Sequence, residues 1–220
     1  MAADSVWRAE KSIIGNGRKD WPLKNKSFLF GATLRGVAPF SFGGSIYPLH
    51  HQWEFYQDAN SLFKDALRLY KPAVWLADIG CGIRPQNIFD AEVTIYVEPH
   101  PEYADWLEHH GFHPLVRKTA EEFLVKAPPL DCAVLFDVIE HMEKDEGKRV
   151  LELAKEKAKQ VFVFTPHGFQ PNHGNERADG LDAWGLHGVE MQRHKSGWTA
   201  EDFVGWQVLI DGDCLLAVWG

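Results

Sequence analysis

The sequence has few cysteines and no long apolar run, and each absence excludes a class of protein. Its 220 residues include three cysteines, Cys81, Cys132 and Cys214, which are far apart and fit no disulfide framework or metal knuckle. We therefore expect buried, reduced thiols. No stretch reaches the roughly 20 apolar residues needed to cross a bilayer, and no basic segment followed by an apolar run marks the N-terminus. These features predict a cytoplasmic protein with no membrane partner.

Basic clusters and metal-binding motifs are also missing. The chain has 23 Lys and Arg against 31 Asp and Glu, a net charge of −8. Phosphate neutralisation supplies most of the affinity for nucleic acid, so scattered basic residues disfavour a nucleic-acid partner. The sequence contains no His-Glu-x-x-His and no Cys-x-x-Cys, and we expect no metal.

Strand and helix patterns alternate through most of the chain. Residues 1–72 are interpreted as an irregular and helical N-terminal cap of the same domain, with helical periodicity over 53–70. An apolar run at 73–77 predicts a strand buried on both faces. Further strands are predicted at 93–97, 114–116, 132–136, 161–164, 206–210 and 215–219, and helices at 101–110, 120–126, 144–159 and 200–205. The pattern predicts an α/β fold in which helices cover a mostly parallel sheet, closed by a hairpin with an Asp-Gly turn.

A glycine-rich turn directly follows the first buried strand. In Asp78-Ile-Gly80-Cys81-Gly82 the glycines allow a tight turn and a close approach of the backbone to a bound cofactor. Glu98 ends the next predicted strand, 20 residues beyond Asp78. A carboxylate in that place can accept hydrogen bonds from both hydroxyls of a ribose. Both features lie at the carboxyl ends of strands, where open α/β sheets bind their ligands.

These motifs resemble those of the class I S-adenosylmethionine-dependent methyltransferases. Residues 78–82 match the family's Asp-x-Gly-x-Gly loop, and Glu98 matches its acidic residue at the end of the second strand. The segment 137–141, Asp-Val-Ile-Glu-His, matches a fourth-strand motif common among small-molecule members. The resemblance covers about residues 73–220. Within the family, the chain is similar to the bacterial methyltransferases of types 11 and 12. It implies a three-layer Rossmann-like fold whose seven-stranded, mostly parallel sheet ends in an antiparallel hairpin.

The resemblance also implies a role for each matching position. S-adenosylmethionine would be the cofactor and S-adenosylhomocysteine the product. The cofactor-binding residues would be Asp78, Gly80, Cys81 and Gly82 at the methionine part and ribose, Glu98 and Pro99 at the ribose hydroxyls, Ala120 and Glu121 beside adenine, and Asp137 near the sulfonium. One segment departs from the family: residues 83–86, Ile-Arg-Pro-Gln, replace the usual further glycine and long helix. We therefore expect a short or irregular first helix.

Candidate catalytic and acceptor residues follow from the same resemblance. His141 is the first candidate for a general base, because the fourth-strand loop lies at the methyl end in related enzymes, and Glu140 is the second. Purely structural roles for both remain open. Residues 165–172 and 192–198 resemble paired segments of bacterial methyltransferases linked to glycan or cell-surface metabolism, in which they cover the acceptor pocket. The predicted acceptor contacts are His167, His194 and Tyr56.

Other classes of protein share part of this pattern. An NAD(P)-dependent dehydrogenase also uses glycines and an acid at the second strand end, but Pro85 stands where its fingerprint needs a third glycine. A non-catalytic subunit that binds S-adenosylmethionine would keep the loop and Glu98. Asp137 precedes Val138 and Ile139 in place of the paired prolines of amino-methylating enzymes of nucleobases and glutamine. We expect O- or N-methylation of a small molecule, with a sugar-containing metabolite as one candidate; the oligomeric state is left open.

Overall fold

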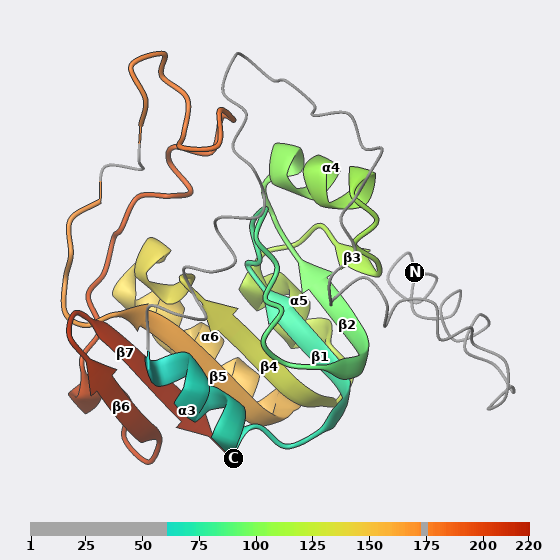
Figure 1. Cartoon of the computed structure of the whole chain (residues 1–220), viewed down its shortest axis with the longest axis vertical. Helices are drawn as coiled ribbons and strands as arrows, with labels where there is room; N and C mark the ends of the chain where they lie inside the picture. The colour runs from blue at the N-terminus through green and yellow to red at the C-terminus, as the bar shows by residue number, and fades with distance from the viewer. Residues whose placement is uncertain (1–60, 173–175) are drawn as a thin grey trace, which may run out of the picture. The chain divides into compact units, whose positions relative to one another are not determined.

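The computed structural model describes residues 61–172 and 176–220, which form one seven-stranded sheet (Figure 1). The strand order is β3-β2-β1-β4-β5-β7-β6. The strands from β3 to β5 are parallel, and β7 runs antiparallel to β5 and β6. The bounds are β1 Ala73–Ile79, β2 Ala91–Val97, β3 Leu115–Val116, β4 Leu130–Phe136, β5 Ala158–Pro166, β6 Gln207–Asp211 and β7 Cys214–Trp219. The predicted parallel sheet with a closing antiparallel hairpin is confirmed.

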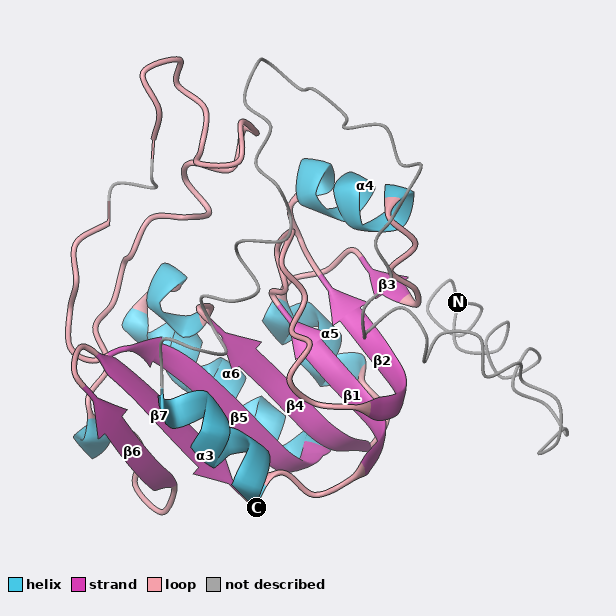
Figure 2. Ribbon diagram, viewed as in Figure 1, coloured by secondary structure: helices cyan, strands magenta, loops and turns pink. Residues whose placement is uncertain are grey.

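Helices pack on both faces of this sheet. Helix α3 lies in front of β5 and β7 in the view of Figure 1, and α5 and α6 lie behind the sheet (Figure 2). The bounds are α3 Ser61–Leu69, α4 Pro101–His109, α5 Ala120–Lys126 and α6 Lys144–Lys157, with 3₁₀ turns η1 Ile139–His141 and η2 Ala200–Asp202. The predicted three-layer arrangement is therefore confirmed. Of the cap predicted for residues 1–72, only residues 61–72 are described, and no described helix is long and apolar enough to cross a membrane.

Burial of apolar side chains between α3 and the sheet explains the apolar patterns of these segments. Helix α3 buries Leu62, Phe63 and Ala66 against the strands. The central strands are covered on both faces, so their sequences are nearly continuous apolar runs. Their members of this core include Leu76, Cys132, Val134, Phe162, Phe164, Leu216 and Val218. Cys81 and Cys132 are buried thiols, as predicted, whereas Cys214 is only partly buried.

Local signals place several element ends well, but β2, β4 and β5 begin two or three residues before their predicted starts, and the helix predicted at 200–205 is only the 3₁₀ turn η2. Helix α5 begins after Thr119, whose side chain and that of Glu122 form a capping box. Helix α6 ends at Lys157, two residues before the predicted end, because Ala158 already pairs with Leu130 of β4. A short or irregular first helix was expected after the glycine turn, whereas residues 80–90, between β1 and β2, contain no helix.

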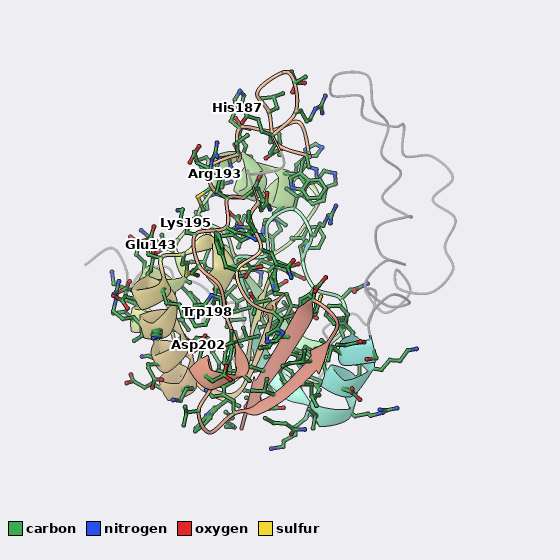
Figure 3. All side chains as sticks on the ribbon, turned by 90° about the vertical axis from the view of Figure 1, so that its left-hand side faces the viewer. Glu143, His187, Arg193, Lys195, Trp198 and Asp202 are labelled. Atoms are coloured by element: carbon green, nitrogen blue, oxygen red, sulfur yellow. The ribbon has the colours of Figure 1, made fainter. Side chains whose placement is uncertain are left out.

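A buried tryptophan holds residues 192–198, the return segment, which lead back toward the sheet after the insert of residues 167–191. Trp198 is fully buried, and its Nε1 donates to Ser196 Oγ at 3.0 Å. Ser196 Oγ in turn donates to the carbonyl of Ile139 in η1 at 3.1 Å. Figure 3 shows the segment running from His187 past Lys195 to Trp198. The return segment is therefore tied to the loop after β4, which carries the candidate catalytic residues.

Gly147 of α6 makes room for this tryptophan, which yields a stability prediction. A Cβ at position 147 would lie 2.5 Å from Trp198 Cζ2. Gly-to-Ala changes in ordinary helix interiors stabilise by roughly 0.5–1 kcal/mol. Here we expect Gly147→Ala to lower the free energy of unfolding by about 1–3 kcal/mol, because the core is overpacked. Urea denaturation measures this change.

The control for this prediction is Glu156→Ala, an exposed change in the same helix. It should alter the free energy of unfolding by less than about 0.5 kcal/mol. A Gly147→Ala protein as stable as the wild type would contradict the close packing on Trp198.

Candidate functional site

A cavity of about 340 Å³ opens at the carboxyl ends of β1 and β4. This is the edge at which parallel α/β sheets bind ligands. The lining residues are Phe63, Asp78, Gly80, Cys81, Gly82, residues 83–88, Phe136, Asp137, Glu140, His141, Pro166, Asn172, Trp184, Gln192 and His194. The cavity thus brings the glycine loop, the 137–141 segment and the return segment together, although they are far apart in sequence.

The glycine loop has the backbone conformation that its sequence requires. Gly80 and Gly82 have φ angles of +68° and +56°, which side chains other than hydrogen rarely allow. A Cβ at Gly80 would also lie 3.0 Å from the methyl groups of Val138. Asp78 is buried beneath the loop, and its Oδ2 accepts from the backbone N–H of Gln86 at 2.7 Å. Burial raises the pKa of Asp78 to about 7, with a further contribution from the charge of Glu98.

Glu98 lies directly behind the glycine loop. Its Oε2 accepts from the backbone N–H of Gly82 and its Oε1 from that of His100, both at 2.8 Å. The side chain is buried, and burial raises the pKa of Glu98 to about 7. Glu98 is not among the residues that line the cavity. The two amides fix its carboxylate at the turn between β2 and α4.

Glu140 is the most deeply buried acid of the 137–141 segment. It is 2% exposed, and its Oε2 accepts from the Thr165 hydroxyl at 2.9 Å. Its Oε1 has no hydrogen-bond partner within the part of the chain that the structure describes. Burial, and then the charge of Asp137, raise the pKa of Glu140 well above its usual value. Asp137 itself has a φ of +54°, the left-handed region, at the end of β4.

Two histidines face one another beside Glu140. His141 and His194 have ring centroids 4.9 Å apart at an angle of 71°. The Nδ1 of His141 lies 3.2 Å from the carbonyl of Arg193, and the Nδ1 of His194 lies 2.7 Å from the carbonyl of Gln170. Burial, and then the charge of His194, lower the pKa of His141 to about 4. His141 is therefore neutral near pH 7.

Several predicted site residues lie away from the cavity lining. Pro99, Ala120 and Glu121 are not among the lining residues, and Ala120 is buried in the first turn of α5. His167 does not line the cavity either, and its backbone N–H donates to the β6–β7 turn at 2.8 Å. Tyr56 falls outside the described residues. Of the predicted acceptor contacts, the structure thus brings His194 to the cavity.

The lining also contains residues that were not among the predicted site residues. Arg84 places its guanidinium carbon 3.7 Å from the ring centroid of Trp184. Arg84 belongs to the segment that departs from the methyltransferase pattern, and Gln192 heads the return segment, so both had a sequence signal. Asn172 ends the other quoted segment. Trp184 lies in the insert, where no motif marks it.

A buried aspartate holds the insert against α4. Asp182 is fully buried, and its Oδ2 accepts from the hydroxyl of Tyr103 in α4 at 2.5 Å and from the Gly188 amide at 3.1 Å. Its Oδ1 accepts from the amides of Trp184 and Leu186, both at 2.9 Å. This network fixes the loop that carries Trp184 over the cavity.

Comparison with known proteins identifies the fold. No family model and no curated protein matches the chain. Among solved structures, the DhpI–SAM–HEP complex is similar with a TM-score of 0.53 and 12% identity, over 77% of this chain and 90% of that one. Small RNA methyltransferase HEN1 gives 0.50 and 18%, over 83% of this chain and 27% of that one. The fold is that of the class I S-adenosylmethionine-dependent methyltransferases. The N-terminal domain of EvdMO1, solved with SAH and D-fucose, gives 0.48 and 15%, over 83% and 88% of the two chains.

The buried Asp78 of this methyltransferase fold predicts a stability that depends on pH. The folded pKa of about 7 exceeds the ordinary value of 3.8, so the ionisation of Asp78 lowers the free energy of unfolding increasingly between pH 4 and pH 7, by a constant amount above pH 7 and not at all below pH 4. Asp78→Asn removes the charge and keeps an oxygen for the Gln86 amide. We expect its free energy of unfolding at pH 8 to exceed that of the wild type by up to about 4 kcal/mol. The difference should vanish near pH 4.

Denaturation at several pH values tests this prediction. Glu92→Gln, an exposed change on β2, is the matched control and should show no such trend. A difference between Asp78→Asn and wild type that stays constant from pH 4 to pH 8 would contradict the raised pKa.

Proposed function

We propose that the protein is an S-adenosylmethionine-dependent methyltransferase that acts on a small-molecule acceptor. One observation carries the proposal: a single cavity is lined both by Asp78, Gly80, Cys81 and Gly82 of the glycine loop and by Glu140, His141 and His194. Methyl transfer needs a cofactor and an acceptor side by side. The alignment of the two reactants can contribute roughly 7–11 kcal/mol to lowering the barrier.

The cofactor end offers acceptors for hydroxyls and negative charge for a cation. Each carboxylate oxygen has two lone-pair positions, so the amide contact of Glu98 with Gly82 leaves room for a ribose hydroxyl. Asp78 and Asp137 line the cavity, where they attract the ammonium and sulfonium groups of S-adenosylmethionine. Pro99, Ala120 and Glu121 keep their assigned places beside the ribose and adenine as part of the proposal.

In this reaction the main task of the protein is to position the acceptor and the methyl group of the cofactor. The sulfonium is a good leaving group, and its charge disperses as the methyl leaves, so exclusion of water does not oppose the step. An efficient general base has a pKa near the working pH. His141, with a pKa of about 4, is a weak base by this criterion, and burial raises the pKa of Glu140 well above its usual value, which favours its neutral form. The pKa shifts therefore favour neither residue as a general base, and His141 and Glu140 keep their proposed places at the acceptor because both line the cavity.

The acceptor end favours a polar molecule with oxygen atoms. A shallow hollow of about 710 Å³ adjoins the cavity and shares Asn172 and His194 with it. Arg177 and Gln170 also line this hollow, which gives it donors for hydroxyl or carboxylate groups. A sugar-containing metabolite with a free hydroxyl fits this lining.

The alternative of a dinucleotide-dependent dehydrogenase has less support. Such enzymes bind the pyrophosphate at the N-terminus of the helix after the glycine turn. Residues 80–90 contain no helix, so this element is missing here. A non-catalytic subunit that binds S-adenosylmethionine shares every feature of the cofactor end and differs only in turnover.

Calorimetric titration with S-adenosylmethionine, S-adenosylhomocysteine and NAD tests the proposal. We expect micromolar binding of the first two and no heat with NAD. Glu98→Gln should weaken binding by roughly 10- to 100-fold, because a hydrogen bond to a charged group is lost. Glu92→Gln, exposed on the same strand, should leave the affinity unchanged. Binding of NAD alone would overturn the proposal, and binding without S-adenosylhomocysteine formation from any hydroxyl or amine acceptor would favour the non-catalytic subunit.

A further inference from the structure

Three metal-ligating side chains meet at the acceptor end of the cavity. Glu140 and His141 belong to η1 after β4, and His194 belongs to the return segment, 53 residues later than His141. One ligand atom from each of the three lies within 4.8 Å of the others. All three residues line the cavity. We propose that Glu140, His141 and His194 form a binding site for a divalent first-row transition-metal ion.

Each histidine is oriented by a backbone carbonyl in the manner of a metal ligand. A carbonyl only accepts, so His141 Nδ1 donates to Arg193 and His194 Nδ1 donates to Gln170. In this tautomer the Nε2 atom of each ring carries the lone pair. Histidines that bind metals almost always donate their other ring N–H to a carbonyl or carboxylate in this way. Asn172 Nδ2 lies 3.3 Å from His194 Nε2, and a half-turn of this amide would present its oxygen as a further ligand.

Glu140 supplies the anionic ligand. Its side chain is 2% exposed and lines the cavity, and Thr165 occupies one of its oxygens. The other oxygen, Oε1, is buried and has no hydrogen-bond partner among the residues described. Buried carboxylate oxygens without a donor are costly, and a coordinated cation removes that cost. This unpaired oxygen is the second, independent sign of a missing cationic ligand.

The ligand types indicate which ion would bind. Imidazole nitrogens suit zinc, iron, nickel and copper, and a carboxylate adds affinity for manganese, so two histidines and one glutamate favour ions such as Mn²⁺, Fe²⁺, Co²⁺ and Zn²⁺. Ligands of one such ion are roughly 2.0–2.2 Å from it and about 3–3.5 Å from each other, so the three side chains would have to close slightly. Three protein ligands leave positions open, which is typical of catalytic metal sites rather than structural ones.

The open positions suggest the class of acceptor, an inference that rests on the proposed function. An acceptor with two neighbouring oxygens, such as a vicinal diol or a hydroxy acid, can chelate the ion. Coordination lowers the pKa of a bound hydroxyl, whose proton passes to solvent water. The oxygen lone pair then bonds to the methyl carbon while the methyl–sulfur bond breaks, and its electron pair remains on sulfur as the neutral thioether.

Cobalt binding tests the site without turnover. The full chain, free of any polyhistidine tag, is titrated with Co²⁺ and followed by visible absorption. We expect one equivalent of Co²⁺ to give ligand-field bands, and His194→Ala and Glu140→Gln to weaken binding by at least about 10- to 100-fold. Glu140→Gln keeps the side-chain shape and the contact with Thr165, and the partly exposed His194 makes its replacement the safer test of folding.

His109→Ala, a change on the exposed end of α4, is the control and should bind Co²⁺ like the wild type. No bound Co²⁺ in the wild type, or unchanged binding in His194→Ala, would overturn the metal site. Titration of the same samples with S-adenosylhomocysteine separates the two proposals: Co²⁺ binding without S-adenosylhomocysteine binding would refute the methyltransferase function and leave the metal site intact.

Discussion

The docking of the return segment on η1 is the interaction on which the site depends. The amides of Lys195 and Ser196 donate to the carbonyl of Glu140 at 2.7 and 3.1 Å. Trp198 is buried next to Gly147 and thereby fixes the position of the return segment on η1 and α6. Without these contacts His194 would have no fixed position relative to Glu140. A segment that contributes no strand to the sheet thereby completes the acceptor end of the cavity.

A second constraint is the burial of carboxylates around one cavity. Asp78, Glu98 and Glu140 are each at most 3% exposed, and burial raises the pKa of all three. Such groups destabilise the ligand-free fold near neutral pH and are retained where a ligand offsets the cost. A sulfonium with an ammonium group at the loop, and a divalent cation near Glu140, are ligands of the required sign.

Much of this could be predicted from sequence because the signals are local. Apolar runs predicted the buried strands, and the start of α5 at Ala120 was also predicted; the structure adds the capping box of Thr119 and Glu122 at this end. The Asp78–Gly82 loop was predicted because its glycines allow a tight turn directly after a strand, and Glu98 was predicted because it ends the next strand. The end of α6 was predicted two residues too late, because the pairing of Ala158 with Leu130 of β4 ends a helix that the sequence pattern would continue. The grouping of His194 with Glu140 is also non-local, so no motif spacing reveals it, and the sequence predicted no metal.

The crystal structure of the complex with S-adenosylhomocysteine would test the central claim most directly, namely that one cavity joins the cofactor loop to the acceptor residues. We predict that the ligand occupies the cavity lined by Asp78 and Gly82, with its ribose hydroxyls on Glu98 and its sulfur directed toward His141 and His194. S-adenosylhomocysteine bound outside this cavity, or with its adenine rather than its sulfur next to His194, would contradict the account.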